Sequence, residues 1–381
     1  MSDSANNKVD LAARLRVARS ASGLTQGQAA DKVGVARTTL VAIEQGERQV
    51  RPAELIALAN LYGTSVNALT RPTAIQSAKA VQFRRNATRG DEESARHAAA
   101  MLNRLAASCV ELERRLERTL VQRYPAERPI VPHTSIQAQG EDLALELRGI
   151  LGLGNAPVSE LPAIVEAELG VRVFLHPLAS DISEVCLFDN DLGANVLLNA
   201  KHARTRQNWS LAHALGHLLT SRQTSDVCYA VDGIKSASEK VADAFAASFL
   251  MPAPALRRRV RDIVGARGQI TVRDLFLLAR EFFVSSEAMC RRLEDLNLLA
   301  GGTWETVRGR GLEREAESDG GLQADHRSPT PSRLAVLVAE AVSSELVSEG
   351  QASEMLCLTR LQLRRLLDDI NALGNETLVL A

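Results

Sequence analysis

The sequence predicts a mostly α-helical chain with one small domain of mixed α+β structure. Apolar residues recur at helical spacing along most of the 381 positions. Short apolar runs of strand length are confined to the region between residues 171 and 200. Polar or proline-rich stretches at 71–90, 124–135 and 300–333 separate the helical parts. At about 100–200 residues per domain, this length indicates two to four domains.

The composition is typical of a globular protein without membrane-spanning segments. Hydrophobic residues make up 45% and charged residues 24%, while aromatic residues are only 3%, so Leu, Val, Ala and Ile must build the core. The first ten residues are polar, and no apolar run reaches the roughly 18 residues of a membrane span. The five cysteines form no CxxC pair. We therefore expect a cytoplasmic protein with reduced thiols.

Charge is distributed unevenly along the chain. The net formal charge is −1, yet residues 1–90 hold 13 Lys and Arg against 6 Asp and Glu. A basic N-terminal part attached to an acidic remainder suggests that only the N-terminal part meets a polyanion.

Residues 9–70 predict a bundle of five short helices. Thr25 is a good N-cap, and Gly34 can end the helix that follows in the left-handed conformation. The next helix turns Leu40 and Ile43 inward. Two helices joined by a tight turn form the geometry that lays one helix in the major groove, so we expect double-stranded DNA as a partner. The alternative is a helical protein-interaction bundle with a solvated charged face.

The polar side chains of this motif predict how it would contact DNA. Gln26 can reach a phosphate, and the guanidinium of Arg37 can bond guanine O6 and N7. The stretches "LTQ", "VGVAR", "IEQGER" and "ALANLYGTSVNAL" resemble the Cro/phage-repressor (XRE-type) helix-turn-helix family. The resemblance implies a homodimer on two half-sites about 34–36 Å apart. It also implies base contacts by Arg37, Thr38 and Ala42, and backbone contacts by Gln26, Thr39, Gln45, Arg48 and Arg51.

Two connecting segments are expected. Residues 71–138 predict a basic linker followed by a long helical spacer over about 91–122, whose heptad-like leucines would also suit a dimerisation helix. Residues 300–333 are rich in Gly, Ser, Pro and charge, and we expect them to be a largely disordered linker.

The C-terminal segment, residues 334–375, predicts helices that resemble a small helix-turn-helix unit. We favour a packing or dimerisation role for it. The alternative is a second DNA-reading unit, because its last helix offers Arg360, Arg364 and Arg365.

Residues 139–299 predict the mixed domain, with helices around three strands at about 171–178, 184–189 and 194–200. After these strands comes the helix "WSLAHALGHLLT". It places His213 and His217 one turn apart on one face, where a single metal ion could bind both. Two histidines at this spacing also occur as ordinary core residues.

Three further features favour the metal site. Gly216 allows close approach of a neighbouring element. Glu239, 22 residues after His217, can be a third ligand, and Asp243 lies one turn further on the same face. Asp243 can accept the N–H of a ligand histidine and fix its tautomer. The apolar end of that helix, "FAASFLMP", can pack on the first helix.

The segments "AHALGH" and "EKVADAFAASFLMP", with "VLLNA" and "LGLGNAPVSELPAIVEAELGVRV" upstream, resemble the ImmA/IrrE family of zinc metallopeptidases. The resemblance implies a zincin-like fold and a zinc ion held by His213, His217 and Glu239. It also implies a bacterial regulator that cleaves or binds a repressor protein, in stress responses or in control of phages and mobile elements.

Ala214 departs from the family pattern, which has Glu after the first histidine. That Glu is the general base, and general acid–base catalysis contributes roughly 10²–10⁴-fold, so we expect no peptide hydrolysis while the metal ligands remain. Ala214 is compatible with a deliberately inactivated chain and with a natural pseudo-peptidase. The function predicted first is a DNA-binding regulator with an inactive peptidase-fold domain. The alternative is a transcription factor whose second domain senses an effector or partner and is non-catalytic.

Overall fold

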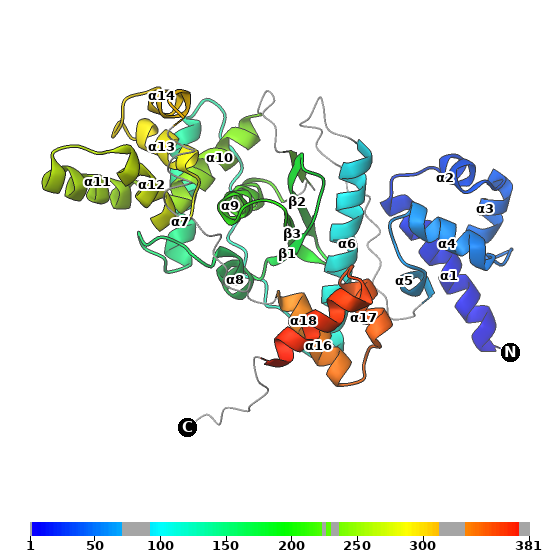
Figure 1. Ribbon diagram of the computed structural model, residues 1–381. Coiled ribbons are helices and arrows are strands. Elements are labelled where there is room, and N and C mark those ends of the chain that lie inside the picture. The colour runs from blue at the N-terminus through cyan, green and yellow to red at the C-terminus, as the bar shows by residue number, and fades with distance from the viewer. Residues whose placement is uncertain (1, 71–91, 223–225, 230–235, 312–331, 373–381) are drawn as a thin grey trace.

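The computed structural model is mostly helical and contains one small sheet, which confirms the expected fold class (Figure 1). Among the residues described, no helix is long and apolar enough to cross a membrane. The described residues are 2–70, 92–222, 226–229, 236–311 and 332–372.

The N-terminal part contains the five helices that the sequence predicts. A separate apolar core holds them together, and its fully buried side chains include Leu15, Leu40 and Leu69. The helices are α1 (Ser2–Ala21), α2 (Gln26–Val33), α3 (Arg37–Glu44), α4 (Pro52–Leu61) and α5 (Val66–Thr70).

The sheet has four strands in the order β1-β3-β2-β4, with β1 parallel to β3 and the other pairs antiparallel. Three strands match the expected ones, and the fourth, β4, was not expected because its four residues are too few to show a periodicity. The strands are β1 (Arg172–His176), β2 (Ile182–Asp189), β3 (Gly193–Asn199) and β4 (Asp226–Tyr229).

Helices cover both faces of the sheet (Figure 1). Val196 and Leu198 of β3 belong to the apolar cluster of α9 (Arg204–Thr220), whereas Leu197 between them belongs to the cluster of α6 (Glu92–Arg115). Successive side chains of a strand point to opposite faces, so every residue of β3 is buried. The central strand β3 therefore buries apolar side chains on both of its faces.

The structure shows that the expected helical spacer within 71–138 is wrong. Helix α6 is not exposed, because Leu102, Leu105 and Leu112 are buried between the sheet and the C-terminal helices. The leucines at helical spacing pack against the sheet and the C-terminal helices of the same chain. Residues 71–91 of the expected linker lie outside the described residues.

The expected disorder of residues 300–333 is also wrong for part of that range. Helix α14 (Thr303–Gly309) buries Trp304 and Val307 in the core, and this burial outweighs the flexibility of the neighbouring glycines. Residues 312–331 lie outside the described part. Helices α16 (Arg333–Ser343), α17 (Glu349–Met355) and α18 (Arg360–Ala372) follow and pack with α6.

The remaining helices surround α9 on the side away from the sheet. Helices α7 and α10 approach closely because Gly140 has no Cβ; a Cβ there would lie 2.6 Å from the Phe245 amide nitrogen. These elements are α7 (Ile136–Ile150), α8 (Leu161–Ile164), the π-helix η1 (Val165–Leu169), α10 (Ala237–Leu250), α11 (Ala253–Arg267), α12 (Val272–Glu281) and α13 (Ser286–Asp295).

A buried ionic network ties α6, the sheet and the C-terminal helices together. Arg172 of β1 donates two hydrogen bonds to Glu113 of α6, at 3.1 and 2.5 Å. Arg333 of α16 donates a third, at 3.0 Å. The side chains of Arg172 and Glu113 are only 3% and 1% exposed, so each depends on the other for its charge to be tolerated.

Candidate functional site

Two helices bring the expected metal ligands together. Helix α9 lies between the sheet and α10, and α10 crosses it at Gly216. A Cβ at Gly216 would lie 2.9 Å from Cα of Ala242, so the prediction that this glycine allows close approach is confirmed. The close crossing places the first turn of α10, with Glu239, directly opposite the two histidines of α9.

The donor atoms converge on one point. The Nε2 atoms of His213 and His217 lie 3.0 Å apart. Nε2 of His213 lies 3.2 Å from Oε2 of Glu239, and Nε2 of His217 lies 3.3 Å from Oε1. Tetrahedral ligands at the usual zinc distances are separated by about 3.3 Å, so this donor set fits a zinc-sized ion. Within the described residues, these three form the one group of possible metal ligands found.

The ring nitrogens that face away from this point are also held. Nδ1 of His213 lies 3.1 Å from Oδ1 of Asp243, and a hydrogen bond from this Nδ1–H would leave Nε2 of the neutral ring available to a metal ion. Nδ1 of His217 lies 3.3 Å from the hydroxyl of Ser238. Ser238 was not among the residues expected from the sequence, and its position beside Glu239 was the one signal that pointed to it.

The electrostatics of the site favour a positive charge. Burial lowers the pKa of His213, but hydrogen bonds to Asp243 and Glu239 and the charge of Glu184 outweigh it and raise this pKa to about 10. Burial raises the pKa of Glu239, but the two histidines outweigh it and hold this pKa far below its ordinary value. A carboxylate-rich pocket that retains a proton so strongly can hold a metal cation in its place.

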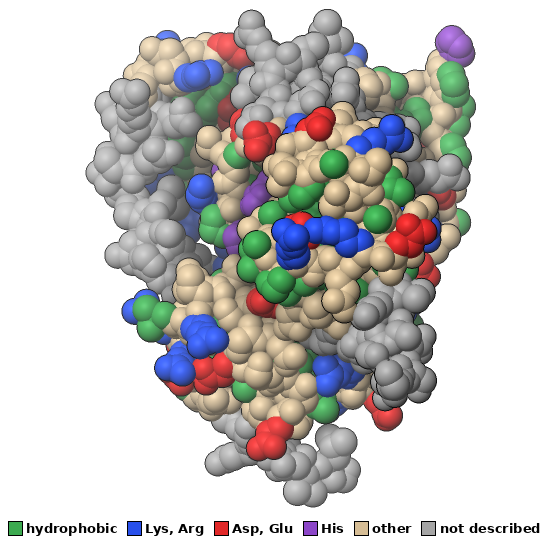
Figure 2. Space-filling view, turned by 90° about the vertical axis from the view of Figure 1, so that its right-hand side faces the viewer, with side chains coloured by type: hydrophobic (Ala, Val, Ile, Leu, Met, Phe, Trp, Pro, Cys, Tyr) green, Lys and Arg blue, Asp and Glu red, His purple; other side chains and the backbone are tan. Residues whose placement is uncertain are grey.

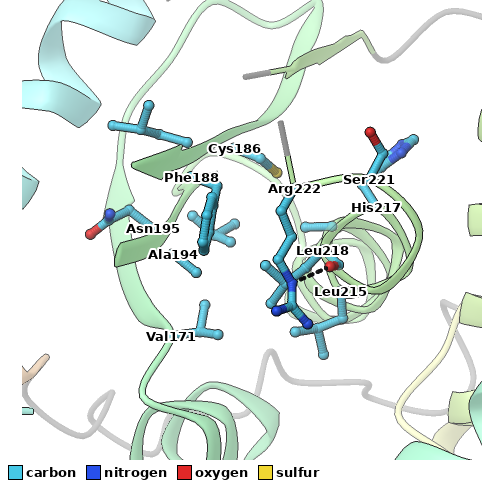
Figure 3. A pocket seen from close by; sticks show the side chains of 13 residues that line it. Val171, Cys186, Phe188, Ala194, Asn195, Leu215, His217, Leu218, Ser221 and Arg222 are labelled. Carbon is cyan, nitrogen blue, oxygen red and sulfur yellow. Dashed lines mark hydrogen bonds between the residues drawn. The ribbon is translucent and has the colours of Figure 1, made fainter. Parts of the chain in front are cut away.

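Ala214 follows His213 on α9 and packs toward the sheet. It is 3% exposed and, with His217, lines a small pocket between α9 and strands β2 and β3. Figure 3 shows Phe188 and Leu218 on its apolar walls and Arg222 reaching across it, with a hydrogen bond to the Leu218 carbonyl. Ala214, which stands where the family has its general base, therefore borders a pocket that is also lined by the candidate metal ligand His217.

The N-terminal motif is built as the sequence predicts. Thr25 and Gln28 form a reciprocal capping box that starts α2. Gly34 ends it with φ 76°, in the left-handed region, and α3 follows with Leu40 and Ile43 buried. The turn chemistry thus sets the angle between the two helices and leaves the opposite side of α3 facing solvent.

The structure places the proposed DNA contacts outside the buried core. Gln26 donates to the buried Glu44, at 2.9 Å, and Arg48 makes two hydrogen bonds to Glu54. Figure 2 shows the side of the molecule that lies at the right of Figure 1, where some Lys and Arg side chains lie near the middle and others are spread among Asp and Glu. Arg37, Thr38, Gln45 and Arg51 are exposed, and Gln26, Thr39, Ala42 and Arg48 are half-buried.

Comparison with known protein families finds two matches. Residues 10–71 match the model of a helix-turn-helix domain, and residues 166–294 match that of the IrrE N-terminal-like domain of peptidase family M78. A search of curated proteins finds no match. The two resemblances drawn from the sequence motifs are therefore confirmed, and the chain joins a helix-turn-helix domain to a peptidase-like domain.

Proposed function

We propose that this chain is a DNA-binding transcriptional regulator whose peptidase-like domain binds zinc without hydrolysing peptides. The two matched domains support a regulator with a peptidase-fold domain. The observation that carries the zinc assignment is the convergence of His213, His217 and Glu239 on one point. Zinc bound there would act as a Lewis acid and activate a water molecule.

Other residues would orient the metal ligands and determine whether a bound water can lose its proton. Asp243 and Ser238 orient the ligand histidines, so the site keeps its shape. Ala214 offers a methyl group where a proton acceptor is needed, so a bound water would have no adjacent base. We infer that a protein segment bound at this site, such as one of a repressor, would be released uncleaved.

Zinc binding can be tested on the purified chain by elemental analysis. We expect about one equivalent of zinc after dialysis, and little in variants with His213→Ala, His217→Ala or Glu239→Ala. Asp243→Asn should retain the site but weaken it by about 10–100-fold. His97→Ala changes an exposed histidine on α6 and should leave the content unchanged. Equal zinc in the ligand variants and in the His97 variant would contradict the assignment.

DNA binding can be tested on a site selected from random duplexes by the full chain. Arg37→Ala should weaken binding to the selected site by about 5–150-fold and relax the preference at one base pair, because a bidentate arginine–guanine contact is worth about 1–3 kcal/mol. Arg16→Ala removes the same charge from an exposed position on α1 and should have little effect. A chain that selects no sequence would refute DNA reading by this motif.

We also propose that the chain binds its operator as a homodimer, because helix-turn-helix domains of this kind occupy two half-sites about one DNA turn apart. Sedimentation of the complex with the selected site measures this directly. One chain per duplex, together with a site that lacks two-fold symmetry, would rule the dimer out.

A further inference from the structure

The C-terminal helices α17 and α18 repeat the construction of the N-terminal helix-turn-helix motif. The repeat holds at a constant offset of 323 residues. Thr25 and Gln28 form the capping box of α2, and Ser348 and Gln351 form that of α17. In each box the backbone N–H of the first residue donates to the Gln Oε1 at 3.0 Å, and the Gln N–H donates back at 3.3 Å.

The turn and the second helix follow the same offset. Cys357, at the place of Gly34, has φ 55°, so both turns pass through the left-handed region. Leu363, at the place of Leu40, is likewise fully buried. The turns are closed by matching backbone hydrogen bonds of 3.0 Å, from Val35 to the Ala30 carbonyl and from Leu358 to the Ser353 carbonyl.

The outward face of α18 is basic where a recognition helix contacts bases. Arg360 occupies the place of Arg37, the first residue of the recognition helix, and Arg364 and Arg365 follow one turn later. All three are exposed, and the two acidic residues of the helix, Asp368 and Asp369, follow one turn after Arg364 and Arg365. Arg364 pairs with Glu349 at 3.0 Å, but its side chain is 65% exposed, and an exposed pair holds its arginine only weakly.

We propose that α17 and α18 form a second DNA-binding helix-turn-helix unit, with Arg360, Arg364 and Arg365 contacting duplex DNA. The equivalence to the matched N-terminal domain and the sign of the exposed charge both support DNA as the partner. This goes beyond the proposed function, in which only the N-terminal motif reads DNA. It adds to the packing role first favoured for the segment, because the apolar side of the unit packs on α6 and α16 while the arginines of α18 stay exposed.

The test uses the full chain with Arg37→Ala and Arg51→Ala, so that N-terminal binding is weakened, and a random-sequence 30-bp duplex as the probe. The affinity is measured between 50 and 200 mM salt. Adding Arg360→Ala, Arg364→Ala and Arg365→Ala should lower the slope of log affinity against log salt by about 2 to 3, because each lost phosphate contact removes about 0.9. The corresponding triple Lys variant should retain the slope.

The control removes three exposed arginines of α11 instead, Arg257, Arg258 and Arg261. An α18 variant with the same slope as this control would overturn the proposal. So would an α18 variant that alters self-association in sedimentation while the slope stays unchanged, since that result assigns α18 to dimerisation. Neither outcome depends on DNA binding by the N-terminal motif. That binding is tested separately, and an Arg37→Ala variant that still binds the selected site normally would contradict it.

Discussion

Substitution of Ala214 by Glu is expected to convert the zinc-loaded chain into a peptidase, with a rise in hydrolysis of about 10²–10⁴-fold over the background rate. The ligand geometry is already in place, and the new carboxylate would enter the pocket that Ala214 and His217 line. Cleavage is measured by mass spectrometry on a mixed peptide library and on the chain itself, so the natural target need not be known.

Ala214→Gln is the matched control for this experiment. Gln has nearly the size of Glu but cannot accept a proton from a bound water, so the zinc content should stay the same and hydrolysis should remain absent. Cleavage by the Glu variant alone, and only with metal present, supports an ancestral or suppressed peptidase. An inactive Glu variant that still binds one zinc favours the alternative function, a domain that senses a partner or effector.

Removal of the Glu113 carboxylate is expected to destabilise the chain by about 3–5 kcal/mol, because Arg172 would remain buried without its counter-charge. For a core of this size the melting temperature should fall by roughly 6–20 °C. Arg333 would lose its contact as well, so the C-terminal helices should loosen from α6. Calorimetry of Glu113→Ala measures the first effect, and hydrogen exchange in α16 measures the second.

Glu340→Ala is the control for the buried network. Glu340 pairs with Arg118 at the surface, with side chains 37% and 64% exposed, so its loss should cost less than about 1 kcal/mol. Combining Glu113→Leu with Arg172→Met should recover most of the lost stability, because paired apolar replacements remove the buried charges together. A Glu113→Ala variant as stable as Glu340→Ala would show that Arg172 finds another anion or water.

Local sequence chemistry was sufficient for much of the fold. Thr25 favours the N-cap position and Gly34 favours the left-handed conformation, so these residues mark where α2 begins and ends. The N-terminal motif could therefore be predicted from the sequence. Strand β4 and helix α14 were missed for the opposite reason. Four residues at a sheet edge, or Trp304 amid glycines, become ordered only through the neighbours that they pack against.

The candidate metal site could be predicted from the sequence only in part. The spacing of His213 and His217 put both on one face of a helix, and the absence of a base at Ala214 can be read directly from the sequence. The sequence alone could not bring Glu239 to within 3.3 Å of both histidines, because that distance depends on how α10 crosses α9 at Gly216. It also could not identify Ser238 as the partner of His217.

The sequence by itself determined which chemistry this protein can carry: a helix-turn-helix motif, two histidines with a carboxylate, and no base beside them. These properties depend on residue type and on spacing within one helix. Only the tertiary structure decided that α6 is a core helix rather than a spacer, and that Arg360, Arg364 and Arg365 of α18 face solvent. Both depend on which apolar faces meet, and contacts between segments more than 200 residues apart leave no local pattern in the chain.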